Sequence, residues 1–311
     1  MRFGKLTGVL ALTTAALIWG LAFSAQRQAL EHLGPAIFNS CRSYVGGAAL
    51  LLLAAILRIF QRPQTAPSNR PLKTLLLGGL ACGTCMAAGS LLQQIGLKYL
   101  SAGKAGFLTA LYIVMVPLFG ICLGRKVRLL LWAAVGISIG GAYLLCRPEA
   151  GSLGRGDVIM LCSAVCFSWH ILVIDYFVTR TNVILLSALQ VLVNGTLSLL
   201  VSRCFGESLS WTAILAALPP ILFCGVGSTG IAFTLQMFGQ KLVSATAASL
   251  LMSLESVFAV VGGWLWLHEI LSGRELIGCG LILAAVILSQ LPGSSSEKST
   301  PVPNSADAPS A

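Results

Sequence analysis

This 311-residue sequence contains few charged residues. Only 10% of the residues are Asp, Glu, Lys or Arg, whereas 56% are hydrophobic. An ordinary soluble domain has roughly 25% charged residues, so a soluble globule with a single core is excluded. The charge is also one-sided, with 20 basic and 10 acidic residues. Because the basic residues lie in short gaps between apolar runs, they fit membrane topology and leave no compact basic segment for nucleic acid.

Motifs for catalysis, metal binding and nucleotide binding are also missing. The sequence contains neither an H-E-x-x-H metal motif nor a G-x-x-x-x-G-K-[ST] phosphate loop. The pattern G-x-S-x-G occurs from Gly136 to Gly140, but inside an apolar run, where its two glycines indicate helix packing instead. Cys82-x-x-Cys85 has no second ligand pair. We predict that the protein is not an enzyme and has no catalytic residues, cofactor or metal site.

Apolar segments fill most of the chain. There are ten of them, at about 6–25, 35–57, 74–97, 102–123, 129–146, 157–178, 183–202, 212–235, 243–267 and 275–291. Most are long enough to cross a bilayer, and in lipid each must be helical to satisfy its own backbone. The predicted fold class is an all-α integral membrane protein with ten transmembrane helices. The first segment is too long for a signal peptide and is interpreted as an uncleaved helix.

The gaps between the segments predict the orientation. With the N-terminus inside, the inner gaps and ends hold 12 basic residues and the outer gaps hold seven. This asymmetry favours a multi-pass protein of the cytoplasmic membrane with both termini in the cytoplasm. The last residues, 292–311, are rich in Pro, Ser and Ala, have almost nothing to bury and are predicted to be a disordered tail.

The two halves of the sequence repeat. Ser101 and Ala102, at the head of the fourth segment, match Ser244 and Ala245 at the head of the ninth, 143 residues later. Five spans are an odd number, so the second copy must be inverted in the membrane. The predicted division is a first five-helix repeat at 1–146, a connecting loop at 147–156 and a second five-helix repeat at 157–291. Inverted repeats place the substrate site at their interface, near the midplane.

Glu255 lies at the centre of the apolar run Val243–Leu267. As a helix this run would span about 37 Å, with Glu255 about 18 Å from either end. A charge at that depth costs roughly 2.5–3.5 kcal/mol, so the carboxyl group should face protein or water. By the repeat offset its counterpart is Tyr112. We predict that both residues bind substrate and that Glu255 is the candidate for proton coupling. The alternative is a carboxylic acid that only connects neighbouring helices.

Four further residues complete the predicted substrate-binding set. Gln94 and Gln236 each follow a face of small residues, where an amide group could contact a solute or only bond another helix. Trp19 could form a wall of the site or an anchor at the membrane interface. His170 could share a proton with Glu255 or be structural. Arg42 lies early in the second segment, so its side chain is expected to reach toward the interface, with anion binding as the alternative.

Several short motifs carry a resemblance to a known family. They are Trp19-Gly20, Cys41-Arg42, Leu100-Ser101-Ala102, Gly156-Asp157, Leu235-Gln236, Ser253-Leu254-Glu255 and His268-Glu269-Ile270-Leu271. Through them the sequence resembles the EamA-type branch of the drug/metabolite transporter superfamily, over residues 6–291. The resemblance implies ten helices in two inverted repeats, a central cavity and carriage of small metabolites or drugs. The sequence departs from the family pattern after the fourth segment, where the basic residues Arg125 and Lys126 stand in place of the acid that the family commonly has.

Together these features predict a secondary transporter that moves a small organic metabolite or drug by alternating access, with proton coupling as a further hypothesis. Its predicted partners are that solute and membrane lipids, with no nucleic acid and no protein partner. The alternative is an intramembrane enzyme acting on a lipid or peptide, with Glu255 and His170 as an acid/base pair. That alternative requires the two side chains to lie within hydrogen-bonding reach.

Overall fold

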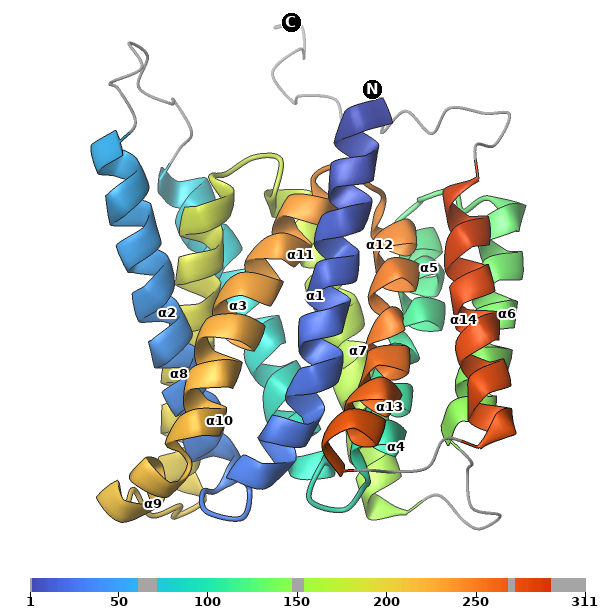
Figure 1. Ribbon diagram of the computed structural model, residues 1–311. Helices are drawn as coiled ribbons and strands as arrows, with labels where there is room; N and C mark the ends of the chain where they lie inside the picture. Colours follow the sequence, from blue (N-terminus) through green and yellow to red (C-terminus); the bar gives the residue numbers. More distant parts are fainter. Residues whose placement is uncertain (1, 61–71, 147–153, 268–271, 292–311) are drawn as a thin grey trace, which may run out of the picture.

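The computed structural model describes residues 2–60, 72–146, 154–267 and 272–291. All regular secondary structure among these residues is helical, and the helices stand side by side in one bundle (Figure 1). Nine helical segments are long and apolar enough to cross a membrane, and a tenth, residues 129–144, is shorter. The predicted all-α membrane fold is confirmed. The predicted tail and the motif at 268–271 lie outside the described residues.

The first half of the chain forms five spans. Their helices are α1 (Arg2–Ala29), α2 (Pro35–Phe60), α3 (Leu72–Gly96), α4 (Ala102–Ala110) with α5 (Tyr112–Cys122), and α6 (Leu129–Cys146). The fourth span is divided in two because the helix is interrupted at Leu111. Ser101 begins this span as an N-cap, and its hydroxyl accepts a hydrogen bond from the Lys104 N–H, which would otherwise have no partner.

The second half also forms five spans. Its helices are α7 (Arg155–Phe177), α8 (Val183–Cys204), the series α9 (Trp211–Ala216), α10 (Leu218–Leu222), η1 (Phe223–Ala232) and α11 (Phe233–Gln240), then α12 (Ala245–Met252) with α13 (Leu254–Leu267), and α14 (Gly273–Gln290). The series that forms the eighth span contains two prolines at the start of α10 and then a π-helix, η1. A π-helix within a membrane span is a frequent mark of a functional region.

The repeat predicted from the sequence is visible in the details of the fourth and ninth spans. Ser244 caps α12 through the Ala247 N–H, as Ser101 caps α4. The ninth span is interrupted at Ser253, near the position that corresponds to Leu111. Equivalent helices also pack against each other, α2 on α8 and α6 on α14. Such self-pairing is what a two-fold relation between two halves produces.

The chain enters and leaves the bundle on the same side. The Lys5 ammonium group, near the start of α1, donates to the backbone carbonyl of Gln290, at the end of α14, over 3.4 Å. An even number of crossings is required for this arrangement. One packing prediction is wrong: a Cβ atom added at Gly136 or Gly140 would meet no neighbour, so these glycines do not lie at a close helix contact. Gly141 does, against the backbone of Gly278 in α14.

Candidate functional site

A cavity lies inside the bundle and contains five of the six predicted binding residues. Trp19, Tyr112, His170, Gln236 and Glu255 all contribute to its wall. The space not filled by atoms is about 520 Å³, part of it open to the outside. The composition of its wall suits a small molecule, which typically occupies a concave, mostly apolar site with a few polar groups. Both halves of the chain supply lining residues.

Glu255 and Tyr112 touch each other inside this cavity. The Tyr112 hydroxyl donates to Glu255 Oε1 over 3.0 Å, and both residues are buried. The two positions are 143 residues apart, which is the offset between the repeats. Residues related by a two-fold axis can contact each other only close to that axis. The hydrogen bond therefore marks the place where the two repeats meet, and the carboxyl group sits at the centre of the bundle.

Arg42 also lines the cavity, which corrects the expectation that its side chain reaches toward the membrane interface. The residue is only 3% exposed, so it cannot extend to the headgroups. Its Nε–H donates to Asn39 Oδ1 over 2.8 Å, and Nη1 donates to Gln26 Oε1 over 3.1 Å. The guanidinium group also lies 5.5 Å from the Phe38 ring. Hydrogen bonds to Asn39 of α2 and Gln26 of α1 hold the guanidinium group at the cavity, below the surface of the bundle.

A buried network behind Arg42 fixes the position of its guanidinium group. Asn39 accepts from Arg42 and donates through Nδ2 to Asn194 Oδ1 at 2.9 Å and Ser198 Oγ at 2.7 Å. Asn194 in turn donates to Ser43 Oγ over 2.9 Å. These bonds join α2 to α8 and leave the Asn39 amide only one useful orientation. Arg42 is thus directed toward the cavity by contacts that span both halves of the chain.

Removing the centre of this network should destabilise the protein. In Asn39→Ala the Arg42 Nε–H and the polar groups of α8 lose their common partner. We expect a loss of about 1–3 kcal/mol in the free energy of unfolding, measured in detergent micelles. Ser43→Ala, which removes a group at the edge of the same network, should cost less. Equal stability of Asn39→Ala and the wild type would contradict this account.

Gln94 is the one predicted binding residue that does not reach the cavity. It is fully buried in α3, and neither atom of its amide group has a partner among the described residues. Its helical face also contains Gly83, which packs closely against Val193 and Gln190 of α8. The preceding residue, Gln93, lines the cavity instead and donates to Thr109 Oγ1 over 3.3 Å. A face of small residues thus indicated a helix contact in this case.

The remaining lining residues give the cavity aromatic walls and two amide groups. The Trp19 indole N–H donates to the Ser228 carbonyl over 3.2 Å, and the Trp19 ring meets the edge of Phe233 at 4.9 Å. Gln236 lines the cavity with an Oε1 atom that has no partner in the described part of the chain. Sequence reasoning missed Gln26, which lies near the end of its span and is easily taken for an interfacial residue.

His170 and Glu255 line the same cavity but are bonded to different partners. The His170 Nε2 and Gln190 Oε1 atoms lie 2.9 Å apart and form a hydrogen bond. Glu255 bonds to Tyr112, and no hydrogen bond joins the histidine to the carboxyl group within residues 154–267. The geometry that an acid/base pair requires is therefore not formed here.

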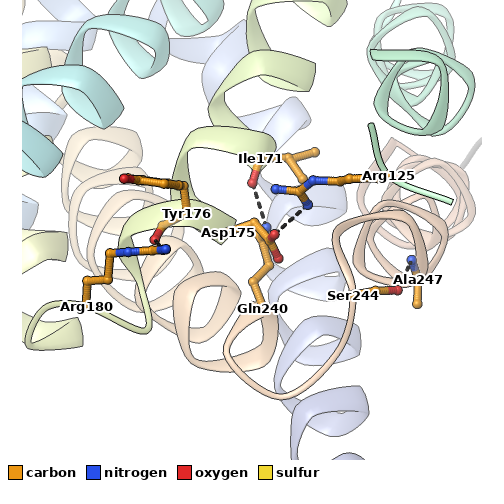
Figure 2. Close-up of polar contacts among 8 residues, drawn as sticks. All are labelled: Arg125, Ile171, Asp175, Tyr176, Arg180, Gln240, Ser244 and Ala247. Carbon is orange, nitrogen blue, oxygen red and sulfur yellow. Dashed lines mark hydrogen bonds and ion pairs between the residues drawn. The ribbon is translucent and has the colours of Figure 1, made fainter. Parts of the chain in front are cut away.

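At one end of the bundle, an ion pair gives a structural role to Arg125, the basic residue that follows the fourth span where the family commonly has an acid. Figure 2 shows Arg125 directed at Asp175 of α7, with Nη1 and Oδ2 2.5 Å apart. Beside it, the Gln240 amide donates to the Ile171 carbonyl over 2.8 Å (Figure 2). Arg125 thus has an acidic partner on another helix, and the two contacts tie the loop after α5, the helix α7 and the end of α11 together.

This ion pair should contribute little to stability. The side chains of Arg125 and Asp175 are 37% and 21% exposed, so solvent screens their attraction. A double-mutant cycle with Arg125→Gln and Asp175→Asn should give a coupling energy of about 0–1 kcal/mol, decreasing as salt is added. Unfolding of the four proteins at low and high salt measures it. A coupling well above this range, independent of salt, would show that the pair is shielded from solvent.

Two repeats of apolar helices around an internal cavity with a few polar groups are typical of a multi-pass membrane transporter. Comparison with known proteins specifies the family. The profile of the EamA-like transporter family matches residues 6–147 and, a second time, residues 154–291. The chain therefore belongs to the EamA-like transporter family, within the drug/metabolite transporter superfamily.

Individual relatives agree with this assignment. An uncharacterized transporter of Archaeoglobus fulgidus is 27% identical over 92% of this chain and 87% of its own length. The uncharacterized inner membrane transporter YedA of Escherichia coli K12 is 28% identical, covering 94% and 93%. A probable terminal-alkyne amino-acid exporter of Streptantibioticus cattleyicolor is 27% identical, covering 93% and 94%. These names point to transport and not to an enzyme.

A solved structure shares the fold. A protein crystal structure superposes with a TM-score of 0.74 at 20% sequence identity, covering 91% of this chain and 98% of the other. At that identity the likeness concerns the arrangement of the helices alone.

Proposed function

We propose that this protein is a secondary transporter that moves a small organic solute across the cytoplasmic membrane by alternating access. The observation that supports the proposal best is the cavity. It lies where the two repeats meet, and its wall includes the hydrogen-bonded pair of equivalent residues, Tyr112 and Glu255. Rocking of one repeat against the other around such a site would open it first to one side of the membrane and then to the other.

Glu255 is the proposed proton-coupling residue. It is the acidic group among the described residues that line the cavity, and its Tyr112 partner is uncharged at ordinary pH. A buried carboxyl group can bind a proton when the solute leaves and release it when the solute returns. The distribution of basic residues supports an orientation with both termini in the cytoplasm.

The first experiment compares metabolites inside and outside cells that produce either the wild type or Glu255→Gln at equal membrane abundance. Glu31→Gln is the matched control, because Glu31 is exposed at the turn between α1 and α2. A solute redistributed by the wild type and by Glu31→Gln, but not by Glu255→Gln, supports the proposal. The relative named as an amino-acid exporter makes amino acids the first solutes to measure. Redistribution of no solute by the wild type would contradict the proposal.

A further inference from the structure

We infer that the cavity selects zwitterionic solutes, with the carboxylate of the solute on Arg42 and its ammonium group on Glu255. This inference deepens the proposed function and rests on it, because it names the class of solute that the same cavity would take. It starts from the charged and ionisable groups of the cavity, which holds one guanidinium group and one carboxyl group that are not bonded to each other.

The positive charge of Arg42 has no acidic partner in the described part of the chain. The two ion pairs there are Lys104–Asp157 and Arg125–Asp175. The partners of Arg42 are the neutral amide groups of Asn39 and Gln26, and its Nη2 group makes no hydrogen bond to the described residues. A charge this deeply buried is costly when it is unpaired. A solute that brings a carboxylate would supply the missing partner.

The guanidinium group is also positioned to recognise a carboxylate by shape. A guanidinium group offers parallel N–H groups that match the two oxygens of a carboxylate. The bond from Nε to Asn39 fixes one edge of the Arg42 group, and the network of α2 and α8 fixes Asn39. Since the orientation is set before the solute arrives, little side-chain entropy is lost on binding.

Glu255 provides the complementary end of the site. Its Oε1 atom accepts from Tyr112, whereas its Oε2 atom makes no hydrogen bond to the described residues although Glu255 lines the cavity. Arg42 and Glu255 line the same cavity, so a small zwitterion that occupies it can contact both groups.

The rest of the cavity suits the neutral part of such a solute. Trp19, Phe167 and Phe233 contribute aromatic surface to the wall, and an ammonium group is attracted to the face of such rings. A purely cationic solute would leave Arg42 unpaired and be repelled by it. A purely anionic solute would leave the carboxyl group of Glu255 without a cationic partner. A solute with both charges is the one that satisfies both groups at once.

The test uses the purified full-length protein in lipid nanodiscs. The probes are the 20 proteinogenic L-amino acids and, for each one that binds, its decarboxylated amine and its deaminated acid. At least one amino acid should bind the wild type, with both analogues weaker by on the order of 30-fold. Arg42→Gln should lose the preference for the amino acid over the amine, and Glu255→Gln the preference over the acid. Arg42→Lys, which keeps the charge, should bind better than Arg42→Gln.

Arg180→Gln is the matched control, because Arg180 is exposed in the turn after α7 and bonds to the backbone carbonyl of Tyr176, near the end of that helix (Figure 2). It should bind like the wild type, and all variants should elute as single species, so that misfolding is recognised. If no amino acid binds, or if Arg42→Gln keeps the wild-type preference, the inference is overturned. The same protein reconstituted in vesicles separates this failure from failure of the proposed function, since transport of an amine or a sugar would refute the zwitterion site and leave the transporter intact.

Discussion

Replacement of Glu255 by Gln is expected to abolish the acceleration of transport by a proton gradient. Gln keeps the size of the side chain and can still accept the hydrogen bond from Tyr112, which measures 3.0 Å in the wild type. It can no longer bind or release a proton. Coupling between two ligands of one protein commonly amounts to about 5–150-fold, so gradient-driven uptake should fall by about ten-fold or more. The measurement is solute flux into vesicles with and without an imposed pH difference.

The Tyr112→Phe variant separates proton binding from packing. It removes the hydroxyl group that bonds to Glu255 but leaves the carboxyl group in place. We expect it to keep its response to the gradient, with a changed dependence on pH. If Glu255→Gln transports at the wild-type rate and with the wild-type pH profile, Glu255 is not the proton-coupling residue.

Replacement of Gly20 by Ala is expected to destabilise the bundle through steric overlap. A Cβ atom added at Gly20 would lie 2.5 Å from the Phe258 Cβ, 2.7 Å from the Glu255 carbonyl oxygen and 2.8 Å from the Ala259 nitrogen. Two of these three atoms belong to the backbone of α13, so α1 and α13 must move apart. Overpacking of this kind typically costs about 1–3 kcal/mol. Because the displaced segment carries Glu255, transport should decrease as well.

The matched control for this prediction is Gly140→Ala. The two substitutions make the same change within a helix, but the Cβ atom at Gly140 meets no atom within 4 Å. Alanine favours a helix over glycine by roughly 1 kcal/mol, so the control should be neutral or slightly stabilised. Thermal unfolding of both variants in the same detergent measures the difference. Equal melting temperatures would show that α1 and α13 are not in close contact at Gly20.

The repeat shows how far local patterns can be followed. The equal heads of the fourth and ninth spans, Ser101 and Ser244, specify equivalent N-caps, because a capping hydroxyl needs only a nearby backbone N–H. The resulting offset pairs Tyr112 with Glu255, and these are the residues that meet in the cavity. Symmetry thus turned a local match into a prediction of a long-range contact.

Helical faces were a weaker guide to the site. Gln94 and Gln236 both follow small residues, yet Gln236 lines the cavity and Gln94 packs away from it. A small residue allows close approach of a neighbouring helix as readily as it leaves space for a solute. Which of the two occurs depends on what lies opposite, and that information is not contained in the segment itself.

The sequence by itself determined the membrane class, the ten apolar segments and the inverted repeat, and it predicted the central depth of Glu255. These properties follow from hydrophobicity, segment length and an odd number of spans, each of which is local or additive along the chain. The tertiary structure alone decided which polar groups share one cavity. It turned Arg42 inward through Asn39 and Gln26, whose positions depend on packing of α1 and α2 against the second half. The charge balance of the site is a property of the assembled bundle.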